Sequence, residues 1–253
     1  MSNSSDILTI PKFEWIDIDS EITVFDQQGS QQSGTVVKIS QYLVTNRQYE
    51  AFVSAGGYQD DAFWGPHLQN EENLENGKRP AFARSRWPQP NRPKTDVNWY
   101  EAMAFCDWLN KEVEVSKPSN QYVFSLPSTK FYGFLHRGHP LFRKGPVDDI
   151  HSKTNIDSKL KQTSTVGLYT PSAEITRSSS IERISDLMGN VWEWCNDSNE
   201  SNFTKEKNSA GLRGGAWGNI QEFACARLVA QLDSRSDIIG FRVCCWLPSN
   251  SKL

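Results

Sequence analysis

Near the C-terminus of this chain, three apolar runs are each interrupted by glycine at a fixed place, and they constrain the fold more than any other feature. They are SDLMGNVWEWC (185–195), LRGGAW (212–217) and IIGFRVCC (238–245). A glycine beside Trp-rich or β-branched residues marks a bulge or tight turn where a Cβ would not fit. Residues 191–194 alternate in polarity, and residues 241–246 have the pattern of a closing strand. We therefore expect short strands joined by glycine-dependent turns.

Helix signals lie upstream of these runs. Thr45 and Gln48 form a capping box, and the helix that follows ends at Gly56. A second helix is expected from Asn98, with Glu101 three residues later, and a short third helix is expected after Ser128. Residues 59–95 and 139–180 show no sustained period, so we expect long irregular segments there.

Several motifs in a fixed order carry a family resemblance. LVTNRQYEAFVSAGGY (43–58), DVNWYEAMAFCDWLN (96–110) and SLPSTKFYGFLHRG (125–138) precede GNVWEWC, RGGAW and GFRV. Together they resemble the formylglycine-generating enzyme, or sulfatase-modifying factor, family over about residues 36–246. The resemblance implies an α+β C-type lectin fold of the formylglycine-generating-enzyme type, irregular-rich, with short strands and a few core helices. We expect one domain over residues 10–248, a flexible N-terminus 1–9 and a tail 249–253.

Composition argues against two classes of partner. The chain has 253 residues, a formal net charge of −3 and 37% hydrophobic residues, which indicates a folded globular protein. Nucleic-acid binding needs a basic footprint, so no nucleic-acid partner is expected. No run approaches the roughly 20 apolar residues of a membrane helix, so no membrane partner is expected. The first residues show no secretory signal, which favours a cytoplasmic protein.

Cysteine usage points to reduced thiols. The five cysteines are odd in number and contain no C-x-x-C motif. Most lie among apolar residues, as buried thiols of a cytosolic protein do. We expect Cys106, Cys195 and Cys244 to be buried and slow to react.

The residues that the family uses for catalysis are not found. Formylglycine-generating enzymes oxidise a substrate cysteine with two cysteines and copper, and these cysteines map here to Asn219 and Ala224. Cys225 is one place off and has no partner, whereas Cu(I) needs paired thiolates. Related sulfoxide synthases need three iron-binding histidines, but His136 and His139 have the pattern of surface residues at a helix end. We expect no enzyme activity, no copper and no iron.

A structural cation is predicted instead. In the family, a calcium ion is held by an acidic or amide side chain, two backbone carbonyls and a glutamate. These map to Asp186, Gly189, Val191 and Glu193, and calcium prefers such oxygen ligands. The alternative is that Glu193 pairs with an arginine such as Arg213 or Arg242, with no ion.

Residues 213–243 resemble the variable region of diversity-generating retroelement proteins, which use the same fold. That resemblance implies that Leu232, Asp233, Arg235 and Ile239 are scaffold. A mixed apolar and polar patch on a rigid scaffold suits a binding surface, whereas the alternative is that Phe223 and Leu228 are core. The positions expected to face a ligand are Trp217, Gly218, Asn219, Ile220, Phe223, Leu228, Ala230, Gln231, Ser234, Ser236, Asp237 and Ile238.

The function expected is therefore non-catalytic binding of an unknown protein or small molecule through a diversified C-terminal surface. Two alternatives stay open. One is an oxidase or sulfoxide-synthase activity of the family, and the other is a non-diversified sensory or regulatory binding module.

Overall fold

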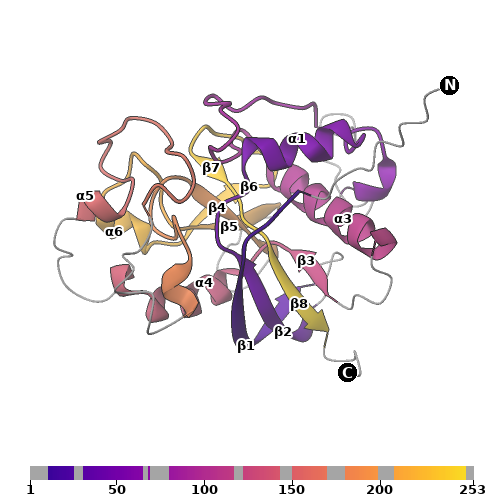
Figure 1. The fold of residues 1–253 in the computed structure, drawn as a ribbon, viewed down its shortest axis with the longest axis horizontal. Helices are drawn as coiled ribbons and strands as arrows, with labels where there is room; N and C mark the ends of the chain where they lie inside the picture. Colours follow the sequence, from indigo (N-terminus) through magenta and orange to yellow (C-terminus); the bar gives the residue numbers. More distant parts are fainter. Residues whose placement is uncertain are drawn as a thin grey trace.

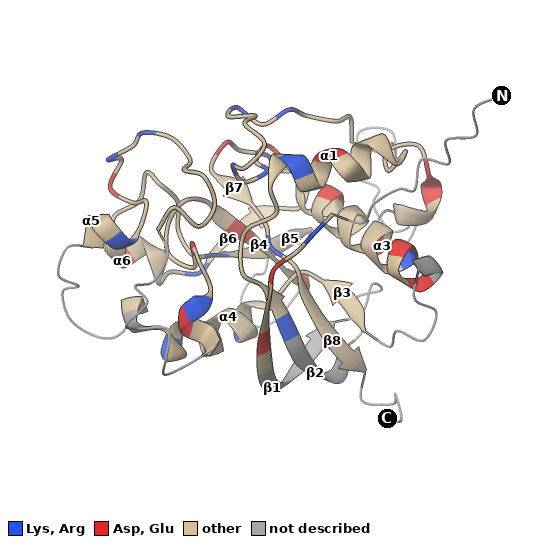
Figure 2. Ribbon diagram, in the orientation of Figure 1, with Lys and Arg blue, Asp and Glu red and all other residues tan. Residues whose placement is uncertain are grey.

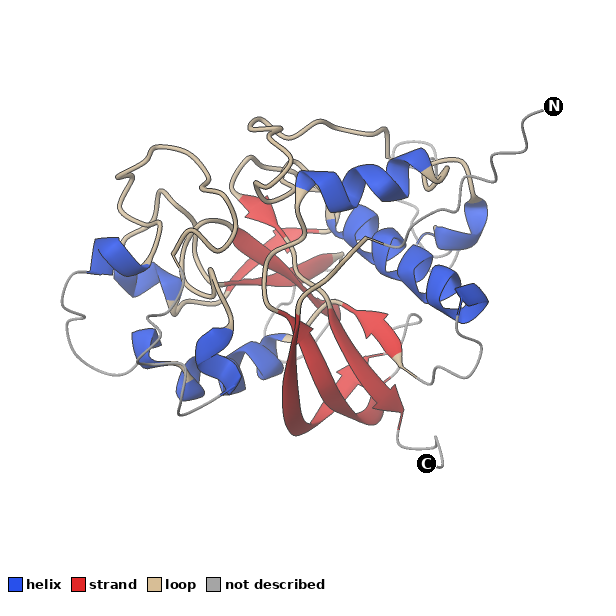
Figure 3. Ribbon diagram, in the orientation of Figure 1, coloured by secondary structure: helices blue, strands red, loops and turns tan. Residues whose placement is uncertain are grey.

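The computed structural model describes residues 11–25, 31–64, 68, 80–116, 122–142, 150–169, 180–198 and 208–248. The predictions for the N-terminus 1–9 and the tail 249–253 lie outside the described residues. Two four-stranded sheets lie at the centre of the molecule, with α1 and α3 beside each other on one side (Figure 1). Long loops and short helices occupy the opposite side (Figure 3).

The first sheet has the strand order β1-β2-β8-β3, and every neighbouring pair is antiparallel. Near the N-terminus, β1 and β2 pair with each other along their lengths. The C-terminal strand β8 lies between β2 and β3, so both ends of the domain join one sheet. Its strands are β1 (Trp15–Phe25), β2 (Gln31–Ser40), β3 (Val123–Ser125) and β8 (Cys244–Pro248).

The second sheet contains the glycine-bounded motifs and has the order β6-β5-β4-β7. Its strands are β4 (Trp192–Ser198), β5 (Ser209–Arg213), β6 (Leu228–Gln231) and β7 (Ile239–Gly240). The closing strand expected over residues 241–246 begins only at Cys244. Residues 241–243 instead carry the chain from β7 to β8, which turns Arg242 into the interior.

The helices begin where the capping signals predict. Before α1 (Asn46–Ser54), Thr45 Oγ1 accepts from Gln48 N at 3.2 Å, and Gln48 Oε1 accepts from Thr45 N at 2.9 Å. The same reciprocal pair precedes α3 (Trp99–Ser116), where Asn98 N donates to Glu101 at 2.8 Å and Glu101 N to Asn98 at 3.0 Å. Such caps stabilise a helix by about 1 kcal/mol each.

The third helix, α4 (Thr129–Gly138), starts at Ser128, whose hydroxyl accepts from Phe131 N at 3.2 Å. No acidic residue follows this cap in the sequence. Asp197 of β4 takes the place of that acidic residue, because its carboxylate accepts a hydrogen bond from Thr129 N, at the first residue of α4, at 2.6 Å. Short helices follow in the irregular parts of the chain: η1 (Asp61–Phe63), η3 (Pro140–Phe142), α5 (Ile150–Lys153), η5 (Ser180–Arg183) and α6 (Gln221–Ala224).

The largest core cluster joins α1 and α3 to the second sheet through buried aromatic residues. It includes Phe52, Phe105, Trp192, Trp194 and Phe241. Two indoles fix α3 and its N-terminal segment to β4: Trp99 Nε1 donates to Cys195 O and Trp194 Nε1 to Val97 O, each at 2.9 Å. A second cluster packs α4 against the first sheet.

The predicted burial of Cys106, Cys195 and Cys244 is confirmed. None of the five cysteines forms a disulfide. Basic and acidic residues are interspersed over the described elements (Figure 2), in keeping with the net charge of −3. Among the described helices, none is both long enough and apolar enough to cross a membrane.

Candidate binding face and the buried motif beneath it

The glycine-containing runs 185–195, 212–217 and 238–245 form a buried motif. Glu193 of β4 lies at its centre and is fully buried. Both of its carboxylate oxygens accept from Arg242, at 2.6 Å from Nε and 2.9 Å from Nη2, and the Tyr132 hydroxyl also donates to it. Burial lowers the pKa of Arg242, but the Glu193 carboxylate outweighs that effect and the net pKa is raised. The remaining guanidinium protons reach Ser40 O, Gln41 O and Ser185 O at 3.0–3.3 Å. The ion pair therefore joins β4 to the segment between β7 and β8, and the hydrogen bond to Ser40 O joins that segment to the end of β2.

The four predicted calcium ligands lie in one turn before and along β4. Asp186 has φ 54° and accepts from Gly167 N at 2.8 Å and Asn190 Nδ2 at 3.3 Å. Burial raises the pKa of its carboxyl to about 6. Gly189 has φ 82°, and a Cβ there would lie 2.4 Å from Asn155 O.

An oxygen-lined space lies beside Gly214, where Leu187 O, Glu193 Oε1 and Val191 O are 3.3, 3.6 and 3.9 Å from the position of an added Cβ. Carbonyl and carboxylate oxygens are the donors that calcium prefers, so the donor types fit. The side chain of Glu193 is also in the ion pair with Arg242 that was the alternative. Within the described residues no three His, Cys, Asp or Glu side chains form a metal-binding group. Calcium binding stays a prediction.

Arg213 and His136 of α4 form a second buried polar group. Arg213 Nη2 lies 3.1 Å from His136 Nδ1, and Nη1 donates to Ala226 O at 3.1 Å. The expectation that His136 and His139 are surface residues was wrong, because both are buried, at 7% and 2% exposed. The His136 ring stacks on Phe142 at 3.8 Å, and burial lowers its pKa to about 2. A neutral histidine held in this way is part of the packing between α4 and η3.

The family's two cysteine positions carry no thiol. Asn219 Oδ1 accepts from Ala216 N at 2.8 Å, which closes the turn after the glycine pair. Ala224 is buried, and its Cα lies 2.9 Å from where a Cβ on Gly215 would be. The neighbouring Cys225 is exposed, and partial burial raises its pKa.

Three of the predicted face residues are large apolar side chains in contact with solvent. Ile220 is 50% exposed, Phe223 49% and Leu228 40%. Phe223 lies on α6, and Leu228 opens β6, the edge strand of the second sheet. The alternative that Phe223 and Leu228 belong to the core does not hold.

The other predicted positions divide by burial. Gly218 and Gln231 are exposed, and the half-buried positions are Trp217, Asn219, Ala230, Ser234, Ser236, Asp237 and Ile238. Ile238 and Ala230 pack partly against the largest core cluster, so they belong to both face and core. Among the expected scaffold residues, Leu232 and Ile239 are buried and Arg235 bonds Glu101, whereas Asp233 is exposed.

Two upstream segments border this face, and the sequence did not single them out. Trp87 meets the Trp217 ring edge-on at 5.7 Å, and Arg86 pairs with Asp237 at 2.7 Å. The backbone N–H groups of Asp157 and Ser158 donate to Asn219 O and Trp217 O at 2.8 and 2.7 Å. These residues lie in irregular segments, where no periodic pattern marks them.

A shallow cavity of about 550 Å³ lies where the 157–158 turn meets the start of the face. Ile220 and Gly218 form part of its wall, together with Asp157, Ser158, Gln221 and Glu222. The face therefore combines exposed apolar side chains with a polar recess.

Comparison with known proteins places this geometry in a family. The model of the sulfatase-modifying factor enzyme 1-like domain matches residues 26–246. The mouse protein named inactive C-alpha-formylglycine-generating enzyme 2 is 24% identical over 246 residues, covering 79% of this chain and 72% of its own length.

Two solved structures share the fold at low sequence identity. Treponema denticola variable protein 1 is 18% identical, with a TM-score of 0.57 over 92% of this chain and 94% of its own. PvdO from Pseudomonas aeruginosa is 20% identical, with a TM-score of 0.58 over 91% of this chain and 92% of its own. They confirm the expected α+β fold of the formylglycine-generating-enzyme type. The chain belongs to the sulfatase-modifying factor enzyme 1-like domain family.

Proposed function

We propose that this protein is a catalytically silent binding protein that presents its ligand-binding face on residues 217–238. The observation that carries the proposal is the exposure of Ile220, Phe223 and Leu228, at 40–50% each, on short elements bounded by buried strands. Exposed apolar side chains grouped among polar ones are typical of interaction sites.

The backbone beneath the face does not depend on these side chains. Leu232 N donates to Asn208 O at 2.9 Å, and Trp217 N donates to Asn190 O at 3.0 Å. Arg213 holds the turn after α6 through Cys225 O and Ala226 O. Fixed backbone with replaceable side chains is the arrangement that a surface open to diversification needs.

Catalytic silence is supported by the chemistry of two positions. Asn219 and Ala224 stand where the family's enzymes carry cysteines, and a carboxamide and a methyl group supply no thiolate. The name of the mouse relative, an inactive enzyme, points the same way. A cysteine-containing peptide incubated with the protein and copper should remain unconverted, and formation of an aldehyde on that peptide would refute this part of the proposal.

The binding role is tested with two displayed libraries of equal size. One randomises Gly218, Ile220, Phe223, Leu228 and Gln231, and the matched one randomises the buried residues Leu212, Leu232, Ile239, Phe241 and Val243. The face library should keep protease-resistant folded members and yield binders to purified test proteins, whereas the buried library should not. Loss of folding in both libraries, or no binder from the face library, would contradict the proposal.

Diversification by a retroelement is the finer part of the proposal. The similarity in fold to a variable protein supports it. The neighbouring DNA should then hold a reverse-transcriptase gene and a near-copy of codons 213–243 that differs at adenines. Without that copy the face would be a fixed one, as in a sensory or regulatory binding module.

A further inference from the structure

A second cavity, of about 600 Å³, lies away from the proposed face, between α1 and the segment that leads to α3. The wall on the α1 side contains Arg47, Tyr49 and Glu50. The opposite wall comes from the segment before α3 and contains Phe82, Arg84 and Lys94. This volume is within the range of small-molecule sites, roughly 300–1,000 Å³.

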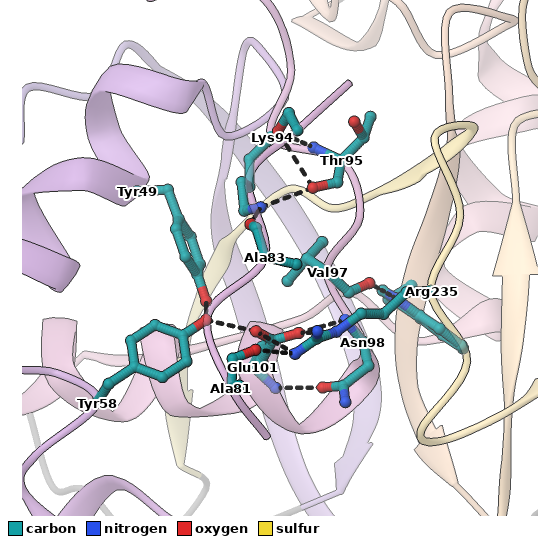
Figure 4. Close-up of polar contacts among 12 residues, drawn as sticks. Tyr49, Tyr58, Ala81, Ala83, Lys94, Thr95, Val97, Asn98, Glu101 and Arg235 are labelled. Atoms are coloured by element: carbon teal, nitrogen blue, oxygen red, sulfur yellow. Dashed lines mark hydrogen bonds and ion pairs between the residues drawn. The ribbon is translucent and has the colours of Figure 1, made fainter. Parts of the chain in front are cut away.

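Lys94 is a buried charged residue in the wall of this cavity, only 2% exposed. Its ammonium donates to Ala83 O at 2.6 Å and Thr95 O at 2.7 Å (Figure 4). It also lies over the rings of Tyr49 and Phe82, at 5.1 and 5.4 Å from their centroids. Within the described part of the chain, no carboxylate forms an ion pair with it. Burial lowers its pKa to about 8, and the carboxylates of Glu101, Asp96 and Glu50 only partly offset that effect. The Lys94 ammonium is therefore a desolvated cation that an anionic ligand would stabilise.

The rest of the lining favours a negative ligand with a flat apolar part. Arg47 and Arg84 are exposed, and Glu50 is the one acidic residue that lines the cavity among the described residues. Phe82 is 44% exposed, which leaves a ring available beside the cations. Guanidinium groups bind carboxylates with two parallel hydrogen bonds and stack on flat rings.

The wall is held in place by a chain of hydrogen bonds. The Tyr49 and Tyr58 hydroxyls are 2.8 Å apart, and Tyr58 in turn donates to Glu101. Arg235 donates to Glu101 at 2.9 Å and to Ala81 O at 2.6 Å, next to Phe82 (Figure 4). A site fixed before the ligand arrives loses less entropy on binding.

We propose that this cavity is a second, separate binding site, for a small aromatic carboxylate. The carboxylate would lie against Lys94, Arg47 and Arg84, and its ring against Phe82. None of these residues belongs to the proposed face, so either proposal can fail without the other.

The test measures binding of benzoate and indole-3-carboxylate to the full chain by calorimetry, with benzamide and indole-3-carboxamide as neutral counterparts. Both carboxylates should bind saturably, and the amides at least about tenfold more weakly, because hydrogen bonds between charged groups are stronger than those to a neutral amide. The double variant Arg47→Gln, Arg84→Gln changes exposed side chains and should weaken the carboxylates about tenfold or more. Lys94→Met should do the same if it folds.

Lys111→Met is the matched control, because Lys111 also lies over a ring, Phe63 at 4.9 Å, but outside the cavity. It should bind the carboxylates as the parent does. The proposal is overturned if neither carboxylate binds, if the amides bind equally well, or if the arginine double variant and the Lys111 variant behave alike.

Discussion

The buried motif around Glu193 and the exposed face of residues 217–238 alternate along one stretch of chain, yet they follow opposite rules. In the motif the central charges are paired: Arg242 and Glu193 are fully buried and bonded to each other. On the face, the ion pair of Arg86 with Asp237 is exposed, and large apolar side chains point to solvent. The second sheet therefore has a paired, buried centre at β4 and exposed apolar side chains near its edge strand β6.

The largest effect should come from breaking the buried ion pair. Arg242→Met leaves the Glu193 carboxylate buried without its partner, which typically destabilises a protein by about 3–5 kcal/mol. Urea unfolding measures the change. Arg86→Met removes the exposed pair with Asp237 and should change the free energy of unfolding by about 0.5 kcal/mol or less. Similar losses in the two variants would erase the contrast between motif and face.

Calcium would strengthen the buried motif if Asp186, Gly189, Val191 and Glu193 bind it. At a hundredfold excess over its Kd, a ligand specific to the native state stabilises it by about 2.7 kcal/mol. Chelator should then lower the melting temperature, and Asp186→Ala, which removes the side-chain oxygen ligand, should abolish the response. Identical melting temperatures with calcium and with chelator would contradict the calcium prediction and favour the alternative, in which Glu193 only pairs with Arg242.

Replacing one glycine in each region by alanine should destabilise the buried motif more than the face. Gly189→Ala places a Cβ at positive φ and 2.4 Å from Asn155 O, so it should cost about 2 kcal/mol or more. Gly218→Ala on the face meets only Ser158 Oγ at 3.8 Å, and surface changes stay within about 0.5 kcal/mol. Thermal unfolding of both variants checks this. A harmless Gly189→Ala would mean that the turn is not tight.

Thiol labelling compares the regions without changing stability. Burial raises the pKa of the Cys106, Cys195 and Cys244 thiols, and these should react only on unfolding. Cys225, beside α6, is exposed and should react first in the native protein. Mass spectrometry after a short labelling pulse identifies the modified residue. Early labelling of Cys195 would show that the core beneath β4 is open.

Much of the scaffold was predictable because short local sequence patterns, such as helix caps, determine where its elements begin. The caps at Thr45, Asn98 and Ser128 lie next to the helices that they start, and the helices formed there. The acid for α4, Asp197, was not predictable, because it comes from a strand far along the chain. His136 was misjudged for the same reason, since its burial depends on Arg213 and Phe142.

The face was predictable only in part. The resemblance to a variable region placed Ile220, Phe223 and Leu228 on the face, and all three are exposed. The half-burial of Ile238 was not visible, because the residue packs against core formed by distant segments. Trp87 was missed because it reaches Trp217 across the fold from an irregular segment.

The most direct test of the central claim is the free energy of unfolding of the triple variant Ile220→Ser, Phe223→Ser, Leu228→Ser, measured in urea against the parent. The claim is that these side chains serve binding and not folding. With each side chain 40–50% exposed, the total change should stay within about 1.5 kcal/mol and the transition should remain cooperative. A loss of several kcal/mol, or no cooperative transition, would show that the exposed face is part of the core that folds the chain.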